Sequence, residues 1–135
     1  MGSEVYIAGV GMTKFGKSMA SLPALMVEAA SRAIGYSKIH TIDYVCIGVM
    51  NAEEFTGDSN IAALIADRLG LSGVPSSRVE TASSTGSAVF ESAFYAVASG
   101  YHKNVLIIAG EKMTHLPTAR TTKILAEVKI GRAHV

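Results

Sequence analysis

Three continuous apolar runs and one shorter mixed run punctuate the chain, at residues 5–10, 44–50, 104–110 and 78–81. Runs of this length that are rich in β-branched residues are typical of strands buried on both faces of a sheet. Segments with apolar residues at helical spacing lie between them. Strands that alternate with helices favour right-handed crossovers. The pattern therefore predicts an α/β fold whose sheet has four parallel strands in a βαβαβαβ order.

Four segments predict helices. The first begins with Ser21 as its N-cap and Pro23 in its first turn, and it ends at Gly35. The second covers residues 60–69, with Asn60 as a candidate cap. The last covers roughly residues 117–128. The first three helices lie in the three crossovers between strands, and the last follows the fourth strand.

The third helix, from Ser83 or Ser84 to Ser99, differs from the others because it is apolar nearly all round. Such a helix is usually buried on more than one side. We therefore expect it to be largely buried, with a second layer from another chain or domain over the face that this chain cannot cover.

Composition supports an apolar surface that faces a partner. Hydrophobic residues make up 49% of the chain and charged residues only 17%, whereas an average protein carries about a quarter charged residues. An excess of this kind indicates a contact surface; a tightly packed core is the alternative.

Charge and apolar length argue against several classes of partner. The net charge of +1 and the scattered Lys and Arg residues give no attraction to nucleic acid, and no apolar stretch approaches the roughly 20 residues of a membrane span. Residues 1–4 do not resemble a signal peptide. Cys46 is the sole cysteine, so we expect it to be buried, inert and reduced, in a cytoplasmic setting.

Other constellations of reactive residues are weak. Gly9 and Gly11 lack the third glycine of a dinucleotide fingerprint. Glu53, Glu54 and Asp58 fall on a predicted loop, where a solvated surface is the alternative to an acid/base or metal site. One further group, His40 with Asp43 or Cys46, lacks the spacing of zinc ligands. The tail is mildly basic, with Arg120, Lys123, Lys129 and Arg132.

Three segments together resemble one family. Residues 5–16 are similar to the opening strand and loop of the thiolase superfamily, residues 79–88 to its nucleophile loop, and residues 96–114 to the next helix end and strand. Their order and spacing are similar in particular to acetyl-CoA acetyltransferases of the archaeal and sterol-carrier-protein type. The resemblance implies a thiolase-like N-terminal α/β subdomain at residues 1–113, followed by a partly helical tail at residues 114–135. It covers about the first third of such a protein.

The resemblance identifies Ser83 as the residue at the position of the family's nucleophilic cysteine. A hydroxyl is a poor nucleophile unless a base removes its proton. In the family, that base and the oxyanion-hole histidine come from the C-terminal half, so no such role is assigned to the four histidines of this chain: His40, His102, His115 and His134. Ser83 and Ser84 would then serve as helix caps. The alternative is that a natural cysteine at position 83 has been deliberately changed to serine.

The resemblance also implies partners. In the family, the strand at residues 78–81 pairs with its twin in a dimer, so a homodimer or a thiolase-like partner chain is expected. Coenzyme A is held largely by parts absent here, so we expect no cofactor and weak or absent coenzyme A binding. The leading hypothesis is a truncated, catalytically silent thiolase-like protein that acts through association. The alternatives are one piece of a split acetyl-CoA C-acetyltransferase and a non-catalytic acyl-CoA binding module.

Overall fold

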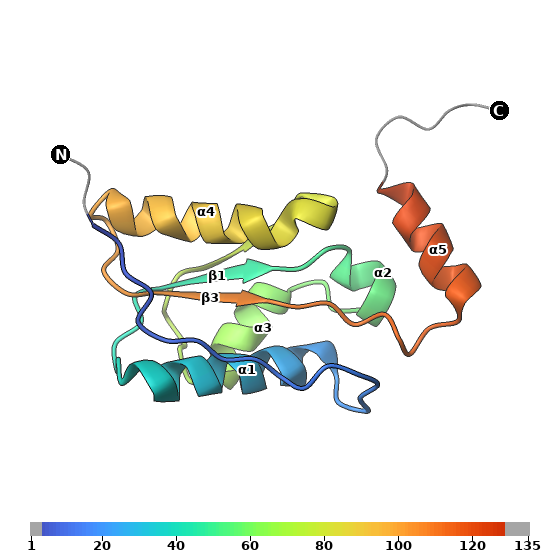
Figure 1. The fold of residues 1–135 in the computed structure, drawn as a ribbon, viewed down its shortest axis with the longest axis horizontal. Helices are drawn as coiled ribbons and strands as arrows, with labels where there is room; N and C mark the ends of the chain where they lie inside the picture. Colours follow the sequence, from blue (N-terminus) through green and yellow to red (C-terminus); the bar gives the residue numbers. More distant parts are fainter. Residues whose placement is uncertain (1–3, 129–135) are drawn as a thin grey trace.

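A three-stranded sheet with helices on both faces organises the chain (Figure 1). The computed structural model describes residues 4–128. The elements in chain order are α1 (Leu22–Ser37), β1 (Tyr44–Gly48), α2 (Ala52–Thr56), α3 (Ile61–Arg68), β2 (Ser76–Val79), the 3-10 turn η1 (Ala82–Ser84), α4 (Thr85–Ala98), β3 (Val105–Ala109) and α5 (Thr118–Glu127). The α/β class is confirmed.

The sheet has the strand order β2-β1-β3, and both pairings are parallel. Val45 of β1 lies opposite Ser76 of β2 and Leu106 of β3. α4 covers one face, while α1 and α3 cover the other (Figure 1). Because β1 is central, its residues from Val45 onward are completely enclosed, as expected for a strand with a continuous apolar sequence.

Apolar side chains form three buried clusters. The largest lies between the sheet and the helices α1 and α3, and includes Leu22, Ile47 and Ile65. A smaller one joins Cys46 to α4. The third lies beneath α5, where Ile124 is completely buried against α2. The predicted helix in the tail is thus confirmed; Lys129, Arg132 and His134 lie outside the described residues.

The predicted first strand, at residues 5–10, is wrong: no strand forms there in the part of the chain that the structure describes. The segment has neither helix nor strand and lies against α1, an approach that is possible because Gly9 and Gly11 lack a Cβ. A Cβ on Gly9 would lie 2.4 Å from the carbonyl oxygen of Ala33, and one on Gly11 would lie 2.2 Å from that of Ala29. The run therefore packs its backbone on a helix and joins no ladder.

Two helix boundaries also differ from prediction. The Ser21 cap is confirmed, since its Oγ accepts the Ala24 N–H at 3.3 Å. However, α1 continues through Gly35 to Ser37 and is closed by Lys38 in the left-handed conformation, with φ 57°. Gly35 faces open space, so the helix passes it without steric consequence.

α4 is buried on one face only, and the expectation that it is largely buried is wrong for this chain by itself. Val89 and Ala93 are enclosed against the sheet. By contrast, Phe90, Phe94 and Tyr95 are 50%, 43% and 59% exposed. The reason is that α4 lies outermost on its side of the sheet (Figure 1).

Candidate nucleophile loop

Residues 80–86 connect the end of β2 to the start of α4 through a sharp turn. Ala82 has φ 51°, in the left-handed region, which is uncommon for a residue with a Cβ. The short 3-10 turn Ala82–Ser84 follows, and α4 begins at Thr85. This strand–turn–helix junction places residue 83 at the carboxyl edge of the parallel sheet, where α/β proteins position ligands.

The side chain of Thr85 fastens the turn. Its Oγ1 accepts the N–H of Thr81 at 3.0 Å and donates to the carbonyl oxygen of Ala82 at 2.7 Å. Thr85 is 5% exposed. The Ser84 hydroxyl adds a bond to the Thr81 carbonyl oxygen at 2.8 Å. A buried threonine with both hydrogen bonds made thus stabilises the left-handed backbone at Ala82.

Ser83 is exposed, and its hydroxyl makes no hydrogen bond to any residue that the structure describes. The predicted helix-cap role of Ser83 is therefore wrong. Ser84 occupies the N-cap position of α4, but it too makes no side-chain cap bond, because its hydroxyl is turned back to Thr81. The intervening 3-10 turn separates Ser83 from the first turn of α4.

A close approach between α4 and β1 fixes the height of the loop above the sheet. Gly48 ends β1 directly beneath the first turns of α4. A Cβ at this position would lie 2.8 Å from Cγ1 of Val89 and 3.3 Å from Cγ2 of Thr85. Only glycine allows this separation, so Gly48 helps to position the nucleophile loop.

An ionic cluster lies at the same edge of the sheet. The Arg78 guanidinium donates to Glu53 and Glu80, each at 2.6 Å, and to the carbonyl oxygen of Val49 at 3.2 Å. Arg78 lowers the pKa of the Glu53 carboxyl, mainly through this hydrogen bond. Glu80 also accepts the N–H of Asn51 at 3.1 Å. The two carboxylates that flank the loop, Glu53 and Glu80, are therefore both paired with Arg78.

Glu111, which follows β3, completes the edge. Its Oε1 accepts the N–H of Met50 at 2.5 Å. Burial raises the pKa of the Glu111 carboxyl, and the negative charge of Glu80 raises it further, against the opposing effects of the Met50 hydrogen bond and Arg78. Sequence reasoning missed Arg78, Glu80 and Glu111. Their shared position just at or after strand ends was the available signal, because parallel strands bring such residues to one edge.

Of the three acidic residues predicted to lie on a loop, only Asp58 does so, and all three take part in structural contacts. Glu53 and Glu54 are in α2, and Glu54 pairs with Arg120 of α5 at 2.6 Å. Asp58 accepts the Thr56 hydroxyl at 2.6 Å. Within residues 4–128, the structure brings no three His, Cys, Asp or Glu side chains together in a group that could hold a metal ion.

Histidines are scattered relative to Ser83. Nε2 of His115 lies 2.9 Å from the carbonyl oxygen of Phe55. His102 stacks on Tyr44 with ring centroids 4.6 Å apart, and its Nδ1 lies 3.6 Å from Asp43. His40 is exposed. None of these three is hydrogen-bonded to Ser83, and the described residues therefore supply no histidine base at that hydroxyl.

Cys46 is completely buried in β1. Burial raises the pKa of its thiol, although Ser77 and Tyr44 oppose the effect. The prediction that this cysteine is buried is confirmed, and its raised pKa disfavours the reactive thiolate.

Among the helices of residues 4–128, none combines the length and apolar character required to cross a bilayer.

The described residues form an α/β domain with a left-handed turn at the carboxyl edge of a parallel sheet and an exposed serine on that turn. Comparison with known proteins identifies its family. A model of the thiolase N-terminal domain matches residues 5–135. The chain belongs to the thiolase family and corresponds to its N-terminal domain.

Named relatives agree with this assignment. The chain is 41% identical over 119 residues to an acetyl-CoA acetyltransferase of Methanocaldococcus jannaschii, and 39% identical over 114 residues to one of Methanothermobacter thermautotrophicus. It is 32% identical over 122 residues to sterol carrier protein 2 of Bos taurus. These matches cover 86%, 82% and 87% of this chain, but only 30%, 30% and 22% of the relatives. The chain thus spans less than a third of their length.

Proposed function

We propose that these 135 residues form the N-terminal scaffold of a thiolase-type protein, perform no acyl transfer by themselves, and act through association with further polypeptide. The observation that carries the proposal is the state of Ser83. Its side chain is exposed, and among the described residues no base is hydrogen-bonded to its hydroxyl. Without removal of its proton, a serine hydroxyl is too weak a nucleophile to attack an acyl thioester.

The reaction considered is transfer of an acyl group from coenzyme A to the residue at position 83. A nucleophile there would form a bond to the acyl carbon, and the coenzyme A thiolate would leave. A thiol at this position would ionise more readily than serine, because a thiol is a much stronger acid than an alcohol, with an ordinary pKa of about 8.5. The turn at residue 83 is compatible with a thiol there, whereas the serine hydroxyl lacks the reactivity of a thiolate.

Association is supported by two surfaces. β2 is an edge strand of the sheet, and an uncovered edge favours pairing with another chain. The aromatic side chains of α4, with Phe90 and Tyr95 at least half exposed, form an apolar surface that needs a partner. We propose a homodimer or a complex with a thiolase-like chain, in a cytoplasmic setting that matches the buried, reduced Cys46.

A thiolysis assay tests the catalytic part. The chain as it is and its Ser83→Cys variant are incubated separately with acetoacetyl-CoA and coenzyme A, and loss of the substrate is followed. No turnover by the unaltered chain is expected. Turnover, or an acetyl adduct on Ser83 formed without another polypeptide, would refute the proposal. Sedimentation tests the association part, since a stable lone monomer at micromolar concentration would contradict it.

A second candidate is one piece of a split acetyl-CoA C-acetyltransferase. The 41% identity to an acetyl-CoA acetyltransferase over most of this chain favours it, as does the intact turn around Ser83. In that case, turnover would appear only when a polypeptide equivalent to the rest of the relatives is added. The Ser83→Cys variant distinguishes the candidates. A scaffold that lacks only the nucleophile gains activity with that polypeptide after the change to cysteine and stays inactive with Ser83. A split enzyme turns over with Ser83 in place.

A further inference from the structure

The backbone donors of the nucleophile loop are used within the loop itself. The N–H of Ser84 donates to the carbonyl oxygen of Thr81 at 3.2 Å, and the N–H of Thr85 donates to that of Ala82. Free N–H groups are what make the N-terminus of a helix attractive to an anion. The 3-10 turn therefore consumes two of the donors that would stabilise a negative charge on residue 83.

Glu80, which precedes Ser83 on the loop, shares one guanidinium with Glu53. Arg78 pairs with both carboxylates at 2.6 Å, so a single positive charge faces two negative charges. Residues 79–101 contain two acidic residues and no Lys or Arg. The loop and α4 therefore supply no cationic Lys or Arg side chain of their own.

Glu111 adds a third carboxylate to this edge of the sheet. Its Oε1 accepts the N–H of Met50, and Ala82 packs against the buried cluster that contains Met50. Glu111 also lies close enough to Glu80 for the negative charge of Glu80 to raise the pKa of the Glu111 carboxyl. Beside residue 83, the three carboxylates thus outnumber the guanidinium of Arg78 by two charges.

α5 and the segment before it contribute no net positive charge. Arg120 pairs with Glu54 of α2 at 2.6 Å. Lys123 and Glu127 are both exposed and lie four residues apart, a spacing at which opposite charges on a helix attract each other. Nε2 of His115 lies at a backbone carbonyl oxygen of α2. The charge balance beside residue 83 therefore stays negative.

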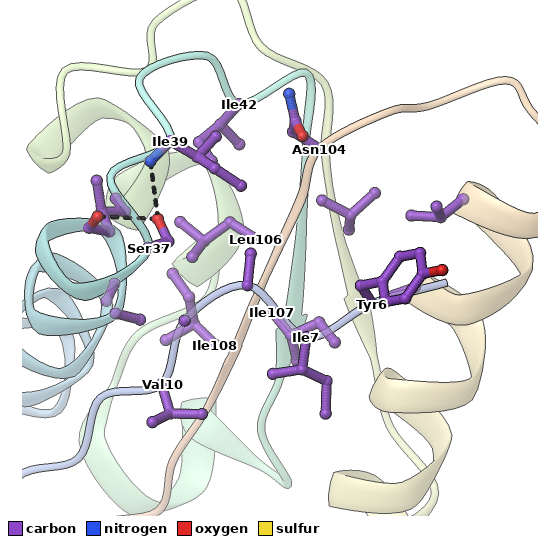
Figure 2. A pocket seen from close by; sticks show the side chains of 18 of the residues that line it. Tyr6, Ile7, Val10, Ser37, Ile39, Ile42, Asn104, Leu106, Ile107 and Ile108 are labelled. Carbon is purple, nitrogen blue, oxygen red and sulfur yellow. Dashed lines mark hydrogen bonds between the residues drawn. The ribbon is translucent and has the colours of Figure 1, made fainter. Parts of the chain in front are cut away.

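Lys112 and the cavity beside β3 do not change this balance. Lys112 donates to two backbone carbonyl oxygens in the segment before α1. The cavity, of about 600 Å³, is lined by residues of β3, α1 and α4 and by residues 4–11, and by none of residues 80–86. Figure 2 shows its largely apolar lining, where the Ser37 hydroxyl is already hydrogen-bonded.

We propose that these surroundings oppose ionisation of residue 83, so that even a thiol placed there stays protonated near neutral pH, and that Glu80 contributes to this effect. The carboxylates repel a developing anion, while donors that would attract it are bonded within the turn. At a separation of about 8 Å in water, one unit charge changes an ionisation equilibrium about twofold. Groups that activate a nucleophile at this position then have to come from polypeptide beyond the described residues.

Ser83→Cys makes the ionisation measurable. Iodoacetamide is an uncharged probe, and the thiolate sulfur bonds to its methylene carbon as iodide leaves. The alkylation rate is followed against pH by mass spectrometry, with the unaltered chain as a blank for the buried Cys46. The same variant in concentrated urea gives the midpoint of the unfolded chain, about 8.5. The folded variant is expected to have an equal or higher midpoint, with at most roughly 3% of the plateau rate near pH 7.

Glu80→Gln tests the source of the effect, because it keeps an oxygen for the N–H of Asn51 and removes the charge. Added to Ser83→Cys, it is expected to raise the alkylation rate near neutral pH roughly 1.5-fold to twofold at an ionic strength of about 0.1 M. The gain should vanish at about 1 M salt. Glu91→Gln is the matched control, since this exposed residue of α4 lies about 12 Å further along the helix axis and should change the rate little.

Three results would overturn the proposal: a folded midpoint below that of the unfolded chain, no gain from Glu80→Gln, or an equal gain from Glu91→Gln. Circular dichroism checks that each variant is folded, and if Glu80→Gln unfolds the chain, the midpoint of Ser83→Cys decides by itself. The inference rests on the proposed function only in treating the chain as inactive by itself. Alkylation needs neither coenzyme A nor turnover, so a low midpoint refutes this inference alone, whereas thiolysis by the unaltered chain refutes the proposed function.

Discussion

Gly48 offers the sharpest test of how the nucleophile loop is positioned. In Gly48→Ala, the new methyl group lies 2.8 Å from Cγ1 and 3.1 Å from Cβ of Val89, well inside the usual contact distance of about 3.5–4.0 Å. Overpacking of this kind costs about 1–3 kcal/mol. Replacing glycine within a strand returns roughly 0.5–1 kcal/mol. We therefore expect a net loss of about 1.5 kcal/mol in the free energy of unfolding.

A double-mutant cycle with Val89→Ala shows whether the contact is the cause. Val89→Ala removes two buried methyl groups and costs about 2 kcal/mol with the cavity that it leaves. The methyl group introduced by Gly48→Ala occupies part of that cavity, so the double variant is expected to lose about 2 kcal/mol instead of the roughly 3.5 kcal/mol that additivity gives.

Urea unfolding followed by circular dichroism supplies the four free energies. Gly86→Ala is the matched control, because a Cβ there meets nothing within 4 Å; in the first turn of α4, it is expected to stabilise by up to about 1 kcal/mol. If the losses at Gly48 and Val89 add to within about 0.5 kcal/mol, the close approach of α4 to β1 does not set the height of the loop.

Three further substitutions test other features. Ala82→Gly removes the steric cost of the left-handed backbone and is expected to raise the free energy of unfolding by up to about 1 kcal/mol. The control Ser87→Gly, at an exposed position of α4, is expected to lower it by up to about 1 kcal/mol. Equal losses of the two variants in urea unfolding would contradict backbone strain at Ala82. Ile124→Ala empties a fully buried site beneath α5 and is expected to cost about 2–3 kcal/mol, with exposed Thr122→Ala within about 0.5 kcal/mol as control; a negligible loss would show that α5 unfolds separately. Burial raises the pKa of the Glu111 carboxyl in the folded state. As the pH rises from about 4.3 through the raised value, this carboxyl ionises first in the unfolded state, so the folded state loses stability over that interval. Glu111→Gln, which keeps an oxygen for the Met50 N–H, should be progressively more stable than the unaltered chain over that interval, and a pH-independent difference would refute this.

Local signals predicted much of the fold. Ser21 and Pro23 marked the start of α1, and the central strand followed from a continuous apolar run enclosed on both faces. The run at residues 5–10 has the same character, yet it forms no strand here. A sequence pattern indicates that a segment is suited to a sheet, but pairing also requires a neighbouring strand edge, and this segment lies against α1 instead.

The position of the turn that carries Ser83 was predictable, but its contacts were not. The strand–helix junction and the family resemblance located Ser83 at the turn. The cap role failed because the 3-10 turn and the Thr85 hydrogen bonds depend on backbone angles at Ala82. The pairing of Arg78 with Glu53, 25 residues away, arises only when β2 meets α2. Such contacts depend on tertiary packing, on which local periodicity carries no information.

The division of labour within the loop has an evolutionary consequence. Thr85 and Gly48 maintain the turn, whereas the hydroxyl at position 83 contributes no contact to it within residues 4–128. The residue at position 83 can therefore change by a single substitution with almost no effect on folding. Selection for a stable fold leaves the identity of that residue open, so any constraint on it has to come from a task other than folding.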